Sequence, residues 1–136
     1  MRFDTKIGIV VRDDLAGWQA LNVTAFMAGA IAGGMPETIG KPYEDASGNA
    51  YLPMIRQPVL VYSADAARLA AVRERALARE LPTALYTADL FATGNDDDNR
   101  AAVRDVPADA LDLVGLAVYG PRNRVDKVLK GLPLHG

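Results

Sequence analysis

The alternation of short apolar runs with helical patterns constrains the fold of this chain more than any other feature of its sequence. Four largely apolar runs have the length of buried strands, at residues 5–12, 57–63, 83–90 and 111–119. Helical patterns separate them, at about residues 17–32, 64–80 and 122–129, with a further short helix between the last two runs. Strands and helices that alternate in this way form a layered sheet with helices on both faces. We therefore predict a three-layer α/β/α fold around a mixed sheet of about four strands.

The chain is expected to form a single domain, residues 1–136, because 136 residues leave too few for a second hydrophobic core. Residues 40–54 interrupt the alternation. Turn-forming residues at 45–49 lie there between two arms that carry aromatic side chains, which predicts a small β-hairpin insertion. Ser63 is expected to cap the helix at 64–80, with Leu77 on its buried face.

The charge balance argues against nucleic acid as a partner. The net charge is −2, and the arginines are spread among acids rather than gathered in a basic stretch. The chain has no cysteine, and its first six residues lead straight into a strand without the pattern of a secretory signal. The uncharged stretch 15–36 is interrupted by polar residues and glycines, so we expect no membrane span and a cytoplasmic protein.

The first helix is apolar almost all round. Leu21, Val23, Phe26, Met27 and Ile31 do not fit a single stripe, which is typical of a helix that is buried on more than one side. One face can meet the sheet, and the other needs a loop or a second subunit. This pattern predicts a homodimer.

Three segments resemble peptidyl-tRNA hydrolase II. The run IVVRDDL at residues 9–15 is similar to that family's first strand, and GPRNRVDKVLKGLPL at 120–134 is similar to its final strand-to-helix segment. The pair Gln57-Pro58 matches the family's entry to the second strand. The resemblance implies a peptidyl-tRNA hydrolase II-like fold over nearly the whole chain apart from the hairpin.

The sequence is more similar still to an uncharacterised bacterial family, domain of unknown function two thousand. Gly17 and Asn22 in the small-residue helix, the hairpin region and the segment VYGPRNRVDK at 118–127 carry this resemblance. It implies the hydrolase-like fold without an assigned reaction.

The positions that correspond to the hydrolase's catalytic groups are altered. Where the hydrolase has a lysine, a glutamine and a histidine in its first helix, this chain has about Leu21, Ala25 and Ala28. Leucine cannot polarise an ester carbonyl as a cation would. Asp89, in TADLF, lies near the family's DAG-type turn but out of register with it. We therefore expect no peptidyl-tRNA hydrolase activity.

Two groups of residues are candidates for a ligand site. Arg122 and Asn123 open the last helix directly after a strand, where backbone N–H groups and a guanidinium suit an anion. A turn with a structural ion pair would explain the same residues.

The second group, Asp14, Asn22, Thr87 and Asp89, follows strand ends and the start of the first helix. Ligands of open α/β sheets bind at such ends. Asp89 and Asn22 are the candidates for catalysis, and Asp14 and Thr87 for ligand binding. Capping of turns and helices is the structural alternative for the two aspartates.

Other polar residues favour structural roles. The run Asp96–Asn99 lacks the glycine and distant glutamate of a calcium loop, so it predicts the acidic first turn of a helix and no metal site. No motif indicates a cofactor. Trp18 is expected to be a packing or interface residue, with stacking on a ligand ring as the alternative.

Three functions are therefore compatible with the sequence. The first is a non-hydrolase relative that binds a small anionic ligand at the sheet edge through Arg122, Asn123, Asp14 and Asp89. The second is a divergent hydrolase or transferase that uses Asp89 and Asn22. The third is an oligomeric interaction module without catalysis.

Overall fold

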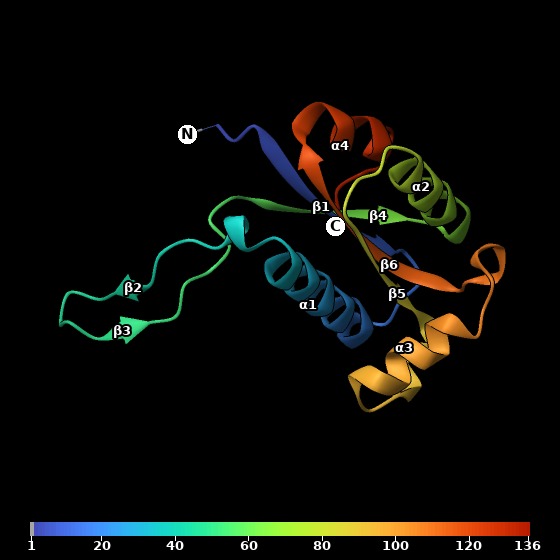
Figure 1. Cartoon of the computed structure of the whole chain (residues 1–136), viewed down its shortest axis with the longest axis horizontal. Helices are drawn as coiled ribbons and strands as arrows, with labels where there is room; N and C mark the ends of the chain where they lie inside the picture. The colour runs from blue at the N-terminus through green and yellow to red at the C-terminus, as the bar shows by residue number, and fades with distance from the viewer. Residues whose placement is uncertain (1) are drawn as a thin grey trace.

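The central sheet has four strands in the order β4-β1-β6-β5 in the computed structural model, which describes residues 2–136 (Figure 1). Strands β1, β4 and β5 run in one direction and β6 runs against them, so the sheet is mixed. The strands are β1 (Thr5–Arg12), β4 (Val59–Ala64), β5 (Thr83–Thr87) and β6 (Leu113–Pro121). The predicted α/β fold with a mixed four-stranded sheet is confirmed.

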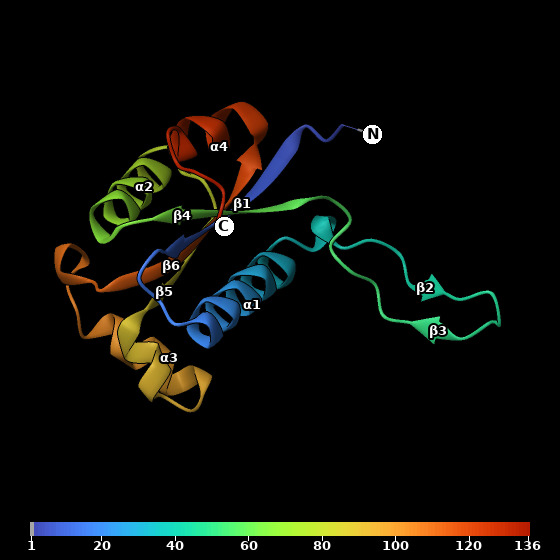
Figure 2. The ribbon, with the colours of Figure 1, turned by 180° about the vertical axis from the view of Figure 1, so that it is seen from behind.

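Helices cover both faces of this sheet. The α-helices are α1 (Gly17–Gly34), α2 (Ala66–Ala78), α3 (Asp96–Arg104) and α4 (Arg122–Leu129), and the short 3₁₀ turns are η1 (Pro36–Thr38), η2 (Ala88–Ala92) and η3 (Ala108–Ala110). Side chains of α1 form one core cluster with one face of the sheet, and side chains of α2 and α4 form a second cluster with the other. Helix α3 lies beside α1, at the edge of the sheet formed by β5 (Figure 2).

The two central strands are the most buried part of the chain. In β6 every residue from Leu113 to Gly120 is buried, and in β1 Ile7, Ile9, Val10 and Val11 are fully inaccessible. Strands buried on both faces read as continuous apolar runs rather than alternating ones. This is why β1 begins and ends at the residues predicted.

The predicted end of β4 and the predicted start of α2 are wrong, because Asp65 caps the helix in place of Ser63. Strand β4 continues through Ser63 to Ala64, and the Asp65 carboxylate caps α2 by accepting from the Arg68 N–H at 2.9 Å. An aspartate is as good an N-cap as a serine, and it lies where the chain leaves the sheet. Leu77, which was expected on the buried face of α2, is 50% exposed.

The predicted hairpin is present as β2 (Tyr43–Glu44) and β3 (Ala50–Tyr51). It forms the tip of an extended arm, residues 40–56, which projects from the body beyond the C-terminal end of α1 (Figures 1 and 2). At its base the Gly40 N–H donates to the Met54 carbonyl at 2.8 Å, and the Arg56 N–H donates to the Thr38 carbonyl at 2.8 Å.

A single carboxylate organises the tip of the arm. Asp45 accepts hydrogen bonds from the N–H groups of Ser47 and Asn49, from the Asn49 side chain and from the Tyr51 hydroxyl. The Tyr51 hydroxyl is the largest cause that lowers the pKa of Asp45, from its ordinary value of 3.8 to about 2. Four donors on one ionised group explain a sharp turn in a hairpin with only two residues in each strand.

We predict that the arm tip loses its order only at strongly acidic pH. Because the pKa of Asp45 is lower in the folded arm than in an open chain, the carboxylate stabilises the turn above pH 3.8 and this contribution is lost as the pH falls through about 2. The Asn49 amide proton shift, followed by NMR across this range, measures it. Asp45→Asn should abolish the transition, and an Asn49 shift that titrates near pH 4 would contradict the assignment.

Candidate functional site

A cleft of about 340 Å³ opens between α1 and the segment that joins β5 to α3. Sites for small molecules fall in this size range and combine apolar walls with a few placed polar groups. The cleft is lined by aromatic and apolar side chains on its walls and by amides and hydroxyls at its rim: Trp18, Asn22, Phe26, Tyr86, Leu90, Phe91, Thr93, Gly94, Asn95, Asp96 and Asn99.

Helix α1 supplies one wall through three residues spaced one turn apart. Trp18, Asn22 and Phe26 lie at i, i+4 and i+8, so they share one face of the helix. The helical rise places Trp18 and Phe26 about 12 Å apart along the axis, with the Asn22 amide between them. The wall therefore presents two rings and a hydrogen-bonding group midway between them.

The other wall comes from the end of β5 and from η2. The Phe91 ring lies 5.6 Å from the Trp18 ring, edge to face, and 5.2 Å from the Tyr86 ring. Tyr86 in turn lies 5.6 Å from Phe26. The four rings form a continuous aromatic chain that joins α1 to the β5 edge, and such pairs stabilise one another beyond simple area burial.

Three polar groups of the cleft are not used by the protein itself. Among residues 2–136, nothing forms a hydrogen bond with the Asn22 amide or the Tyr86 hydroxyl. The Thr93 hydroxyl donates to the Leu90 carbonyl at 3.0 Å and also contacts Asn99 Oδ1, while Asn99 Nδ2 has no partner there. Burial raises the pKa of Tyr86, so this phenol stays neutral and can both donate and accept. The cleft therefore offers donors and an acceptor to a bound molecule.

The charges at the rim do not favour an anion. Asp96, Asp97 and Asp98 fill the first turn of α3, and Asn95 caps the helix by accepting from the Asp98 N–H at 2.9 Å. Arg100 is the cation nearest to them, and it is paired with Asp96 at 2.5 Å and with Asp97 at 3.3 Å. A negatively charged ligand would meet an excess of carboxylates here.

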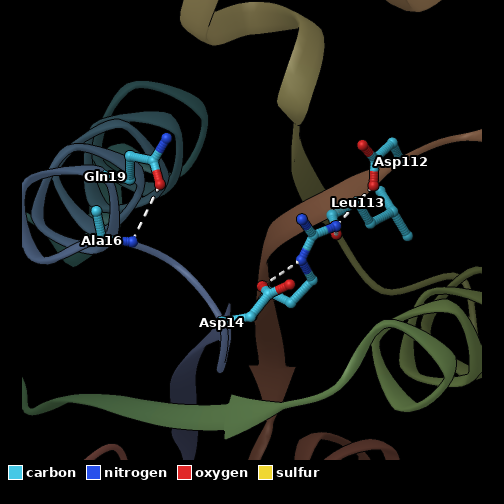
Figure 3. Close-up of polar contacts among 6 residues, drawn as sticks. Asp14, Ala16, Gln19, Asp112 and Leu113 are labelled. Atoms are coloured by element: carbon cyan, nitrogen blue, oxygen red, sulfur yellow. Dashed lines mark hydrogen bonds and ion pairs between the residues drawn. The ribbon is translucent and has the colours of Figure 1, made fainter.

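Arg12, the last residue of β1, forms a second polar cluster with residues that do not line the cleft. Its partners Asp14, Asp112 and Leu113 are labelled in Figure 3. Its Nε donates to Asp14 at 2.6 Å and its Nη1 to Asp112 at 2.6 Å, while Nη1 also contacts the Leu113 carbonyl at 3.2 Å. Hydrogen bonding to Asp14 raises the pKa of Arg12, so the guanidinium stays charged. Arg12 thereby links the end of β1 to the start of β6, and Asp14 takes part in the fold by pairing with Arg12.

Thr87 and Asp89, expected with Asp14 and Asn22 at one site, have different surroundings. Thr87 is buried, and its hydroxyl has no partner within residues 2–136. Asp89 lies in η2, not on a strand, because β5 ends at Thr87. Asp89 is exposed and does not line the cleft that holds Asn22.

Arg122 and Asn123 lie at the opposite end of the sheet from Asp14, Thr87 and Asp89. Because β6 is antiparallel to β1 and β5, the start of α4 follows the sheet end where β1 begins. The prediction that Arg122, Asn123, Asp14 and Asp89 form a single anion site is therefore wrong.

The Arg122 guanidinium is already used by the fold. Its Nε and Nη2 donate to the Phe3 carbonyl at 3.2 and 3.1 Å, and its backbone N–H donates to the Asp4 carbonyl. A hollow of about 290 Å³ lies beside it, lined by Arg2, Phe3, Asp4, Pro121, Arg122 and Asn123.

Sequence reasoning missed most of the cleft. From the sequence, Phe26 is placed only in a helix that is apolar all round and Asn99 only at the end of the acidic run at 96–99, and neither Tyr86 nor Phe91 is singled out. The spacing of Trp18, Asn22 and Phe26 was the available signal, since a polar residue between two aromatic residues at i, i+4 and i+8 defines one face. Nothing in the local sequence indicates that the residues around Tyr86 would face it.

Comparisons with known proteins agree on the family. No functionally curated protein matches the chain. A solved structure of a protein of unknown function from Agrobacterium tumefaciens is similar over 99% of this chain and 100% of its own, with 44% sequence identity and a TM-score of 0.95. The model of the family described as "Protein of unknown function (DUF2000)" matches residues 5–136. The chain belongs to that family.

Proposed function

We propose that the protein binds a small, uncharged, planar heteroaromatic ligand, of the nucleobase class, in the cleft between α1 and η2–α3. The observation that carries this proposal is the pairing of four aromatic rings with polar groups that have no partner within the described chain, at Asn22, Tyr86 and Asn99. Rings give a flat ligand its binding energy, and amides and a phenol recognise the pattern of donors and acceptors at its edge.

The dimensions of the cleft favour one or two fused rings. A volume near 340 Å³ accommodates such a molecule with its hydration partly displaced. Stacking on one aromatic side chain contributes about 1–3 kcal/mol for a base. A ring seated between Trp18 and Phe26 would direct its edge toward Asn22, which lies midway between them.

A peptidyl-tRNA hydrolase II-like fold without the hydrolase reaction belongs to the same proposal. Its support is the resemblance of the first strand and of the last strand and helix, segments that form β1, β6 and α4. Leu21 and Ala25, which take the places of the hydrolase's lysine and glutamine, are exposed on α1 and supply no ionisable group.

A small anionic ligand is the second candidate, at the hollow beside Arg122. Arg2 and Arg122 outnumber the one acid there, Asp4, so the hollow is the more cationic of the two sites. The existing bonds from Arg122 to the Phe3 carbonyl weaken this candidate, because an anion would have to compete for the same donors. A hydrolase or transferase that uses Asp89 and Asn22 has less support, since only Asn22 lines the cleft.

A thermal-shift screen of the protein against nucleobases, nucleosides, sugar phosphates and small dicarboxylates separates these candidates. A ligand at about a hundred times its dissociation constant adds roughly 2.7 kcal/mol, which raises the Tm of a domain of this size by several degrees. We expect a shift with a neutral ring compound that is lost in Asn22→Ala and kept in Arg122→Ala. A shift with a phosphate or dicarboxylate that is lost in Arg122→Ala and kept in Asn22→Ala would instead indicate that the ligand binds beside Arg122.

A further inference from the structure

Exposed apolar side chains gather on two elements that follow each other in the chain. Of the nine large hydrophobic side chains that are exposed within residues 2–136, seven lie on α1 or on the arm, residues 40–56. On α1 they are Trp18, Leu21 and Phe26, and on the arm they are Tyr43, Tyr51, Leu52 and Met54. Large apolar side chains that are exposed together on one element mark an interaction site.

The arm has a defined shape but little contact with its own domain. Every residue from 41 to 52 is exposed, and the arm is held at its base and by the Asp45 turn at its tip. Tyr43 and Tyr51 are direct cross-strand partners, so both side chains lie on the same face of the hairpin. A two-stranded hairpin in water is marginally stable by itself, so packing of its apolar face against a partner would stabilise it.

We propose that this partner is a second copy of the chain, and that the arm of each copy lies along the outer face of α1 of the other. The arm points away from its own α1, so it reaches beyond its own domain (Figure 2). Both halves of the contact are present in one chain, as a two-fold symmetric dimer requires. The Lys41, Glu44 and Asp45 charges of the arm meet no like charge on α1, because none of its 18 residues is ionisable.

The lengths of the two surfaces agree. Helix α1 is about 27 Å long, from 18 residues at the helical rise. Each leg of the arm between residues 41 and 52 extends for about 18 Å. An arm laid along the helix therefore spans most of its exposed face.

The exposed area also fits a stable dimer. Aromatic side chains bury about 150–250 Å² each. Four of the seven exposed side chains are aromatic, and all seven are between half and nine-tenths exposed. They amount to roughly 800 Å² per copy, which is the contribution of one partner to an interface of standard size. Trp18 and Phe26 also line the ligand cleft, so the partner's arm would border it, but the dimer does not depend on any ligand.

Equilibrium sedimentation of the full chain at micromolar concentration tests the proposal. We expect the wild-type protein to be a dimer and Leu52→Glu, on the arm, to weaken association at least 100-fold, with Leu21→Glu on α1 doing the same. Leu77→Glu is the matched control, because Leu77 is half exposed on α2 and outside both surfaces. A monomeric wild-type protein, or a dimer that neither variant weakens, would overturn the proposal.

Disulfide trapping identifies the geometry directly, because the chain has no native cysteine. A mixture of Leu52→Cys and Leu21→Cys proteins should give a covalent heterodimer under mild oxidation. A Leu77→Cys protein mixed with Leu52→Cys should not. Equal trapping in both mixtures would show random collision and would contradict the arm exchange, and this result is independent of whether the cleft binds a ring.

Discussion

Replacing Gly115 by alanine is expected to lower the free energy of unfolding by about 2 kcal/mol or more. Gly115 lies in β6 between Val11 of β1 and Tyr86 of β5, where the sheet has a register shift next to Tyr86. An added Cβ would overlap the Cγ1 methyl of Val23, a fully buried residue of α1. Valine has a single preferred rotamer in a helix, so it cannot turn away. The cost would appear in urea unfolding followed by circular dichroism.

The contact with Val23 can be separated from other effects by a double-mutant cycle. Val23→Ala removes the methyl and should recover part of the loss in the Gly115→Ala protein, so that the double variant is more stable than the sum of the single changes predicts. Gly33→Ala is the control, because nothing lies within 4 Å of an added Cβ at this position of α1. Additive effects of Gly115→Ala and Val23→Ala would show that the close approach of α1 to β6 is not the constraint.

Truncating Phe91 is expected to weaken ligand binding in the cleft by about 10- to 100-fold, the range that the loss of one stacking ring predicts. Phe91 contacts the rings of both Trp18 and Tyr86, so its removal breaks the aromatic chain in the middle. Isothermal titration with the ring compound found by the thermal-shift screen would measure the change.

A leucine at the same position separates shape from stacking. Phe91→Leu keeps apolar bulk and should restore little affinity if the ring is needed, whereas full recovery would indicate a merely apolar pocket. Phe3→Leu makes the same substitution at the other end of the sheet, beside Arg122, and should leave the affinity unchanged. If Phe3→Leu weakened binding and Phe91→Ala did not, the ligand would belong to the Arg122 hollow.

The sequence predicted the fold well where burial decides the structure. The apolar runs that form β1 and β6 are continuous because both faces of these strands are covered, and continuous runs are easy to recognise. The errors lie at strand ends. Asp65 competed successfully with Ser63 as the cap of α2, and the TADLF segment turned into η2 once β5 had no further partner residue on β6.

The candidate site was much less predictable, because sheet direction decides which strand ends meet. Arg122 and Asp89 were expected together, and the antiparallel course of β6 places them at opposite ends. Local sequence does not encode this direction. Trp18 is a candidate for stacking in the sequence, but its ring partner Phe91 is about seventy residues away and meets it only through the packing of α1 on η2. Phe91 in turn contacts Tyr86 of β5.

The intrinsic fluorescence of Trp18 tests the proposed cleft most directly, because Trp18 is the only tryptophan of the chain and lies at the cleft wall. Titration with neutral nucleobases and nucleosides, under selective excitation of the indole, should quench the emission along a saturable curve. The same titration should be shifted to higher ligand concentration in Asn22→Ala and unchanged in Arg122→Ala. Emission that stays constant with every ring compound, or that responds equally in both variants, would contradict a ring-binding cleft.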